Sequence, residues 1–128
     1  MNNSLLQLPT KSDTNNNNNN FLTKEPVQHM KEPTKEGYRL PEMNCIQYAL
    51  KLSIMEDKPI MMDYWTSSID KAVLIGVKEN GEKLLVKSEE EYTSPISKIF
   101  KISNEYIIMT ENSIYLVDIN IPTKRISS

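Results

Sequence analysis

The chain has 128 residues, a formal net charge of −2 and a single cysteine, Cys45. This length allows one domain, and the lone cysteine excludes a disulfide framework within the chain. Residues 1–43 carry five basic and five acidic side chains and residues 44–128 carry ten and twelve, so neither part shows the basic surface usual in nucleic-acid binders.

The start of the chain lacks the basic, apolar and small-residue succession of a secretory signal peptide. No apolar run reaches the roughly 18 residues that a membrane-spanning helix needs. We therefore expect an intracellular protein, located in the cytoplasm or in a virion, that is neither secreted nor embedded in a membrane.

Residues 1–43 are expected to form a disordered tail and a linker ahead of the folded part. Asn15–Asn20 are six consecutive asparagines, and such a tract has no apolar surface to offset the loss of chain entropy. Residues 21–43 alternate charged side chains with prolines, which interrupt helices and sheet ladders alike. The only histidine, His29, lies here and has no second ligand near it in sequence for zinc.

The segment 44–54, NCIQYALKLSI, is where the folded domain is expected to begin. Large apolar side chains occupy every second position, which is the pattern of a half-buried strand. These side chains are Ile46, Tyr48, Leu50, Leu52 and Ile54. A helix is the alternative, with one face made by Ile46, Ala49, Leu50 and Ser53 or Ile54. The regular alternation favours the strand.

Residues 59–65, PIMMDYW, continue the alternation and predict a second strand. Pro59 opens it, at a position where the missing N–H is tolerated. Trp65, the only tryptophan, is interpreted as a core anchor or a lid at the end of the strand. The hydroxyl-rich residues 66–70 are expected to form a connecting loop.

Residues 72–87, AVLIGVKENGEKLLVK, contain the clearest hairpin signal in the chain. Asn80-Gly81 suits a two-residue turn, because both central residues of a type I′ turn need positive φ. This loop would pair Val77 with Leu84 and Ile75 with Val86. The core face of the hairpin is then predicted to contain Val73, Ile75, Val77, Leu84 and Val86.

A second hairpin is predicted around Glu111-Asn112, after a solvated loop that holds the successive carboxylates Glu89–Glu91. A two-residue loop there makes three pairs: Met109 with Ile114, Ile107 with Leu116, and Tyr106 with Val117. Both faces of these strands are apolar, and strands of that kind are covered on both faces. We therefore expect them to lie centrally, against another sheet or against another molecule.

Seven candidate strands between residues 44 and 121, joined by short turns, predict an all-β fold. The expected architecture is a small antiparallel meander of about six to seven strands that forms a barrel or two packed sheets. Residues 44–121 are assigned to this β domain, and residues 122–128 to a polar C-terminal tail.

No constellation of residues in the sequence indicates catalysis. The three glycines, Gly37, Gly76 and Gly81, are not spaced for a phosphate-cradling loop. A single histidine cannot make a zinc site, and no base accompanies the serine and threonine hydroxyls. We therefore predict a protein that is not an enzyme, with no catalytic residues, no cofactor and no metal.

The stretches EDKPIMMDYW (56–65) and KSEEEYTSPISKIF (87–100) together resemble short uncharacterised proteins of giant nucleocytoplasmic large DNA viruses. The resemblance covers roughly residues 44–120. It implies a viral protein that is carried in the particle, and it transfers no catalytic residue.

Two functions compete. The first is a structural or protein-interaction component that contacts a protein partner or a second copy, as part of a viral particle or a homo-oligomer. Its predicted interaction surface comprises Tyr106, Ile108, Tyr115, Val117 and Trp65. The second is a barrel-type nucleic-acid-binding module. Its basic residues would be Lys78, Lys83, Lys87, Lys98 and Lys101, and its stacking residues Tyr48, Tyr64 and Trp65. The doubly apolar strands favour the first function.

Overall fold

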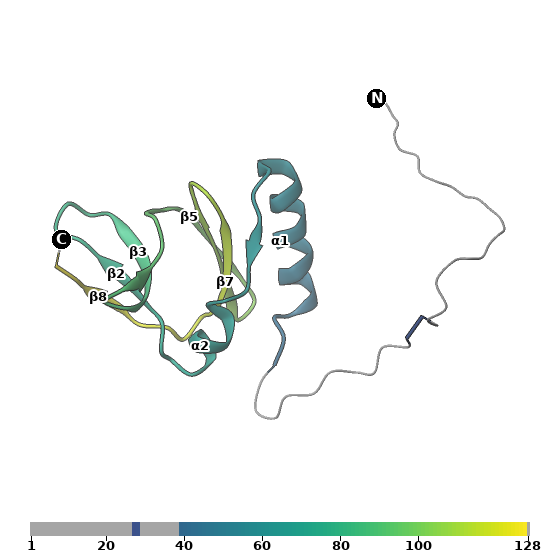
Figure 1. The fold of residues 1–128 in the computed structure, drawn as a ribbon, viewed down its shortest axis with the longest axis horizontal. Helices are drawn as coiled ribbons and strands as arrows, with labels where there is room; N and C mark the ends of the chain where they lie inside the picture. The colour runs from purple at the N-terminus through teal and green to yellow at the C-terminus, as the bar shows by residue number, and fades with distance from the viewer. Residues whose placement is uncertain (1–26, 29–38, 128) are drawn as a thin grey trace. The chain divides into compact units, whose positions relative to one another are not determined.

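The computed structural model describes residues 27–28 and 39–127. Every described helix and strand belongs to residues 35–128, which we call the second unit (Figure 1). Val27 and Gln28 have no regular secondary structure. The predictions of a disordered tail, of an unstructured Asn15–Asn20 tract and of a linker around His29 fall outside the described residues.

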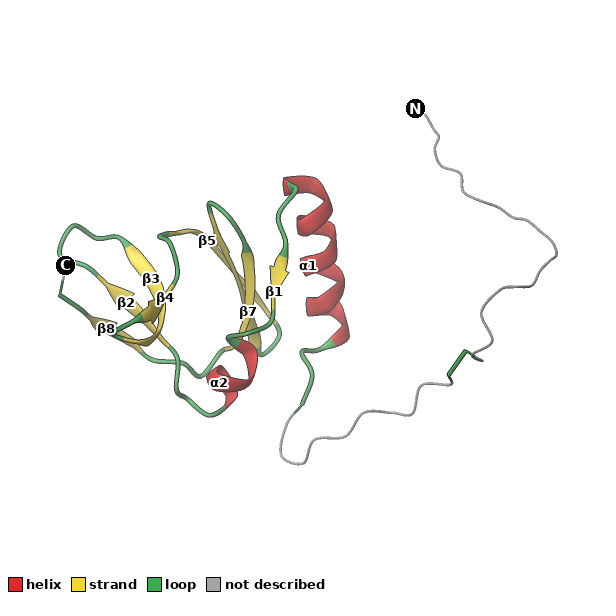
Figure 2. Cartoon of the chain, viewed as in Figure 1, coloured by secondary structure: helices red, strands yellow, loops and turns green. Residues whose placement is uncertain are grey.

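The described residues of the second unit form eight strands and two helices, which are coloured by type in Figure 2. In chain order they are α1 (Met43–Glu56), β1 (Ile60–Met61), α2 (Trp65–Ile69), β2 (Leu74–Val77), β3 (Lys83–Ser88), β4 (Glu91–Tyr92), β5 (Ile96–Ile102), β6 (Glu105–Thr110), β7 (Ile114–Asp118) and β8 (Thr123–Arg125). The first sheet has the strand order β1-β7-β6-β5, and the second sheet has the order β4-β3-β2-β8.

The prediction of a fold made mostly of strands is confirmed, but the meander and the barrel are wrong. β1 runs parallel to β7, and β8 runs parallel to β2, so both sheets are mixed. Each of these two short strands pairs with a strand that is far from it in the sequence. Two strands that were not predicted, β4 and β8, raise the number to eight, although residues 44–54 form no strand. Two open four-stranded sheets result, and they are not a closed barrel.

The first sheet is the middle of three layers, between α1 and the second sheet (Figure 1). One face of β6 and β7 presents Ile107, Met109, Ile114 and Leu116 to a cluster that includes Cys45 and Ala49 of α1. The opposite face presents Ile108 and Val117 to a cluster that includes Ile75 and Leu85 of the second sheet. The register predicted for the Glu111-Asn112 hairpin is confirmed at all three pairs, as is the expectation that both faces are covered.

The strand predicted for residues 44–54 is wrong, because Met43–Glu56 is a helix. Cys45, Ala49 and the half-buried Leu52 are spaced by four and three residues, so they share one helical face that packs on the first sheet. No proline or glycine interrupts the segment. The helix ends at Asp57, whose φ of 56° is left-handed and whose N–H donates to Ser53 O, just before Pro59.

The strand predicted for residues 59–65 is confirmed only at Ile60–Met61, and the loop predicted for 66–70 is largely the short helix α2. The side-chain hydroxyl of Ser68 explains this change of direction. It donates to Trp65 O at 2.6 Å and accepts the Asp118 N–H at 2.9 Å. These bonds hold α2 at the end of β7, so the chain turns away from the first sheet after two residues of β1.

The turn predicted at Asn80-Gly81 is confirmed, but its register is wrong by one residue. Lys78 N–H donates to Glu82 O at 2.8 Å and Gly81 N–H donates to Lys78 O at 2.9 Å, which leaves a three-residue loop. Only Gly81 has positive φ there, at 91°, as in a type I turn followed by a bulge. Gly76 therefore pairs with Leu84, and Ile75 pairs with Leu85.

This shift turns the side chains of β3 over, because a slip of one residue exchanges the two faces of a strand. Leu85 is fully buried and packs with Val73 and Ile75 in the core, where Leu84 and Val86 were predicted. Leu84 and Val86 lie on the outer face of the second sheet, together with Leu74.

Residues 122–128, predicted as a polar tail, contain the edge strand β8 (Thr123–Arg125). Backbone groups hold it: Ile75 N–H donates to Pro122 O at 2.9 Å, and Ile126 N–H donates to Val77 O at 3.0 Å. An edge strand of this kind needs no apolar side chains, because its partner supplies the ladder of hydrogen bonds. The polar sequence therefore did not indicate it.

Candidate functional site

The five residues predicted as an interaction surface lie inside the fold. Ile108 and Val117 have no exposed surface, and Trp65 is 5% exposed. Tyr106 and Tyr115 are half-buried and pack against the same cluster as Ile108. The second sheet of the same chain thus covers the face that the sequence left without a partner, so an outward-facing contact surface must come from other residues.

The residues of the nucleic-acid alternative are also divided. Tyr64 is 3% exposed and packs edge-on against Tyr115, with ring centroids 5.3 Å apart, and Trp65 is buried as well. Neither ring is therefore open for a base to stack on. The lysines are spread over both sheets. Lys78 comes directly after β2, and Lys83 and Lys87 lie on β3. Lys98 and Lys101 lie on β5 of the other sheet. Tyr48 lies on α1 and is exposed.

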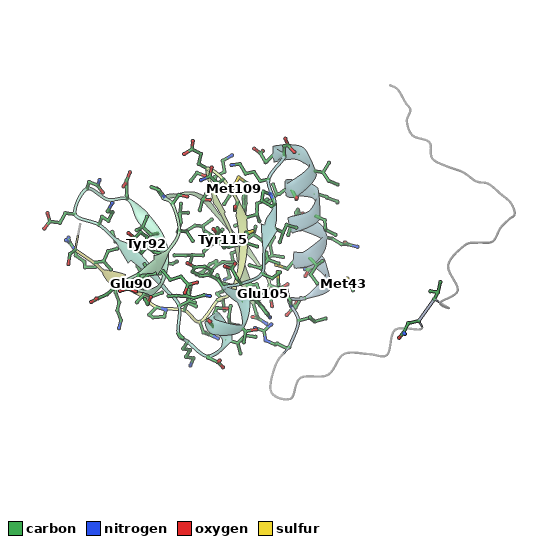
Figure 3. All side chains as sticks on the ribbon, in the orientation of Figure 1. Met43, Glu90, Tyr92, Glu105, Met109 and Tyr115 are labelled. Atoms are coloured by element: carbon green, nitrogen blue, oxygen red, sulfur yellow. The ribbon has the colours of Figure 1, made fainter. Side chains whose placement is uncertain are left out.

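A buried ionic cluster joins the chain before α1 to the first sheet. Glu105 has no exposed surface, and its carboxylate accepts Arg39 Nη1 at 2.9 Å and the Glu42 N–H at 3.1 Å. Arg39 also pairs with Asp118 and lies over the Trp65 ring, 5.0 Å from its centroid. Figure 3 shows Glu105 within the fold. The cluster gathers residues that are 66 and 79 positions apart, so no local sequence pattern marks it.

The hydrogen bonds of this cluster hold the segment before α1 in place. Trp65 Nε1–H donates to Arg39 O at 2.7 Å, and Asn120 N–H donates to Asp118 Oδ2 at 2.9 Å. Both carboxylates are thus committed to donors within the fold. They hold the entry to α1 in place, and a carboxylate that is already satisfied in this way is poorly suited to move a proton to or from a substrate.

Cys45 lies beside this cluster and is fully buried. Burial, followed by the negative charge of Glu105, raises the pKa of the Cys45 thiol from 9.0 to about 12. Because the thiolate is the reactive form, we expect the native thiol to resist a maleimide at mildly alkaline pH and to react once denaturant unfolds the chain. Complete labelling of the native protein within minutes would contradict this.

The same pKa difference predicts an alkaline loss of stability. The thiol of the unfolded chain ionises near 9.0, whereas the folded one ionises near 12, so the unfolded state releases its proton first. The stabilisation that comes from the neutral Cys45 thiol is fully present below pH 9.0 and is lost as the pH rises toward about 12. We expect the unfolding free energy of Cys45→Ala to decrease less steeply with rising pH than that of the wild type. The decrease that remains is expected from Tyr64, because burial raises its pKa to about 12.

The outward face of α1 carries an apolar stripe that no described residue of the second unit covers. Met43, Leu50 and Ile54 are 70%, 51% and 81% exposed, and their spacing of seven and four residues places them on one side of the helix. We call these three residues the α1 stripe. Because α1 is apolar both here and on its sheet-facing side, its sequence showed no clear helical period.

The outer face of the second sheet forms an apolar groove of about 700 Å³. We call it the outer groove, and its apolar lining is Leu74, Leu84, Val86, Tyr92 and Ile126. Ile126 folds over Gly76 so closely that a Cβ there would lie 2.7 Å from Ile126 Cδ1. Lys78, Glu89 and Arg125 add charges to the lining.

Among the described residues, no group of three or more histidine, cysteine, aspartate or glutamate side chains is placed to hold a metal ion. No described helix is long and apolar enough to cross a membrane. In comparisons with known proteins, no family model, no curated protein and no solved structure matches the chain.

Proposed function

We propose that this chain is a non-enzymatic structural or protein-interaction component that contacts its partner through the α1 stripe. The observation that carries the proposal is the exposure of Met43, Leu50 and Ile54 along one side of a helix. A partner that covers these side chains would remove a continuous row of apolar surface from water. The side chains gain about 25 cal/mol for each Å² of apolar surface removed from water.

Two further parts of the proposal rest on the sequence. The non-enzymatic role rests on the lack of a phosphate loop, a zinc motif and a nucleophile with a base. A place inside the cell, in a viral particle, rests on the resemblance of residues 56–65 and 87–100 to proteins of giant DNA viruses.

The proposal is tested by Ile54→Glu in the full chain, with Met55→Glu as the matched control. Both residues are exposed and adjacent on α1, but Met55 lies about 100° further round the helix and off the stripe. Light scattering during size-exclusion chromatography reports the assembly, and the fluorescence of an apolar dye reports the open surface.

We expect the wild type to assemble or to bind the dye, Ile54→Glu to lose that behaviour, and Met55→Glu to keep it. A wild type that is monomeric and does not raise the fluorescence of the dye contradicts the proposal. So does an Ile54→Glu variant that behaves as the wild type does.

A further inference from the structure

The two uncovered apolar surfaces lie on the two outer layers of the fold. The α1 stripe faces away from one side of the first sheet, and the outer groove faces away from its other side, beyond the second sheet. Figure 3 shows this separation, with Met43 beside α1 and Tyr92 at the second sheet. Neither surface can therefore cover the other within one compact unit.

We propose that the α1 stripe of one copy docks into the outer groove of a second copy, so that the chains associate head to tail. This inference rests on the proposed function, since it takes the α1 stripe as the contact surface and names a second copy as the partner.

The dimensions of the two surfaces agree. The stripe runs over the twelve residues from Met43 to Ile54, whose eleven steps span about 16 Å at the rise of an α-helix. The second sheet has four strands, and their three spacings span about 14 Å. A helix that crosses this sheet can thus set its whole stripe on the apolar lining. The fold already uses the same kind of contact, because the other side of α1 covers the first sheet.

Charges at the ends of both surfaces favour one direction of the helix. The last turn of α1 has no basic residue and ends in the exposed Glu56 and Asp57, where the helix dipole is also negative. In the groove, Arg125 lies on the edge strand β8, whereas Glu89 lies at the opposite edge, in the turn between β3 and β4. The C-terminal end of α1 therefore fits the Arg125 end, and this match alone sets the direction, because the N-terminal end carries the exposed Glu42 and has no basic side chain to offer Glu89.

The remaining charged side chains of the groove contribute less to this direction. Lys78 Nζ lies 3.5 Å from a Glu82 carboxylate oxygen, and Lys87 Nζ lies 3.3 Å from one of Glu91. These half-buried lysines already have acidic partners in their own chain, so their charge is partly offset there. Arg125 thus sets the polarity of the bound helix.

Such a contact is heterologous, because it joins two different surfaces. Each added copy brings one occupied and one open surface, so assembly continues beyond two chains or closes as a ring. An isologous pairing of α1 with α1 would instead stop at two chains and would leave the groove unused. This difference makes the proposal testable by mixing two variants.

The experiment uses full-length chains that each lack one surface. The stripe variant carries Leu50→Glu and Ile54→Glu, and the groove variant carries Tyr92→Glu and Ile126→Glu. Light scattering should give the mass of several chains for the wild type and of one chain for each variant alone. The equimolar mixture should give two chains, because the intact groove of the first variant takes the intact stripe of the second. Formation of this mixed pair also shows that both variants fold.

Four outcomes overturn the proposal. They are a monomeric wild type, a groove variant that assembles as the wild type does, a stripe variant that does so, and a mixture that stays at one chain. The first two leave the proposed function standing if the wild type binds the apolar dye or if Ile54→Glu abolishes assembly. The head-to-tail contact can thus fail without the proposed function failing.

Discussion

Replacement of Glu105 by alanine is expected to lower the free energy of unfolding by about 3 kcal/mol, the lower end of the range for breaking a buried ion pair. The carboxylate has no exposed surface and accepts from both Arg39 Nη1 and the Glu42 N–H. Its removal leaves the Glu42 N–H without its acceptor and takes from Arg39 one of its two acidic partners. The lower end applies because the Arg39 side chain is 43% exposed and keeps Asp118 as a partner.

The matched control for this variant is Glu82→Ala. Glu82 also pairs with a basic residue, since Lys78 Nζ lies 3.5 Å away, but its side chain is 46% exposed. Exposed pairs of this kind contribute about 0.5 kcal/mol or less. Urea denaturation of both variants measures their losses of unfolding free energy. Equal losses in the two would show that the buried cluster is no more stabilising than a surface pair.

Replacement of Leu85 by alanine is expected to cost about 3 kcal/mol of unfolding free energy, through lost burial and the cavity left behind. Leu85 has no exposed surface and packs with Val73 and Ile75 against the first sheet. Because the neighbouring strands belong to one tightly packed layer, the site has little freedom to collapse around the missing atoms.

Leu84→Ala is the control, because it removes the same atoms one residue away. Leu84 is 6% exposed but faces the outer groove, so its truncation leaves a space that opens into the groove instead of an enclosed cavity, and we expect a smaller loss of about 2 kcal/mol. The comparison tests the register of the β2–β3 hairpin directly. A two-residue loop at Asn80-Gly81 would reverse the order of the two variants, and thermal or urea unfolding would show the reversal.

Local sequence was sufficient where a structure depends on residues close together in the chain. The hairpin at Glu111-Asn112 needed only a short loop between two apolar runs, and its register follows from it. The apolar character of both faces of β6 and β7 correctly indicated a middle layer. Gly81 likewise marked its turn, because the positive φ there suits glycine.

The same local signals were insufficient wherever two structures had similar local energies. Residues 44–54 alternate as a strand does, yet the first sheet offers a surface that Cys45 and Ala49 fit as one helical face. The hairpin loop has three residues, because that register places Leu85 against Val73 and Ile75. In both cases packing with distant residues outweighed the local preference.

The sequence by itself thus determined the strand-rich composition, two turns and the doubly covered strands. The tertiary structure alone decided the helix α1, the parallel pairing of β1 with β7, the strand β8, and the ionic cluster at Glu105. It also decided which surfaces stay open, since it buried the predicted surface around Ile108 and exposed the α1 stripe. The physical reason is that exposure is a property of the whole packed chain, whereas periodicity describes only one element at a time.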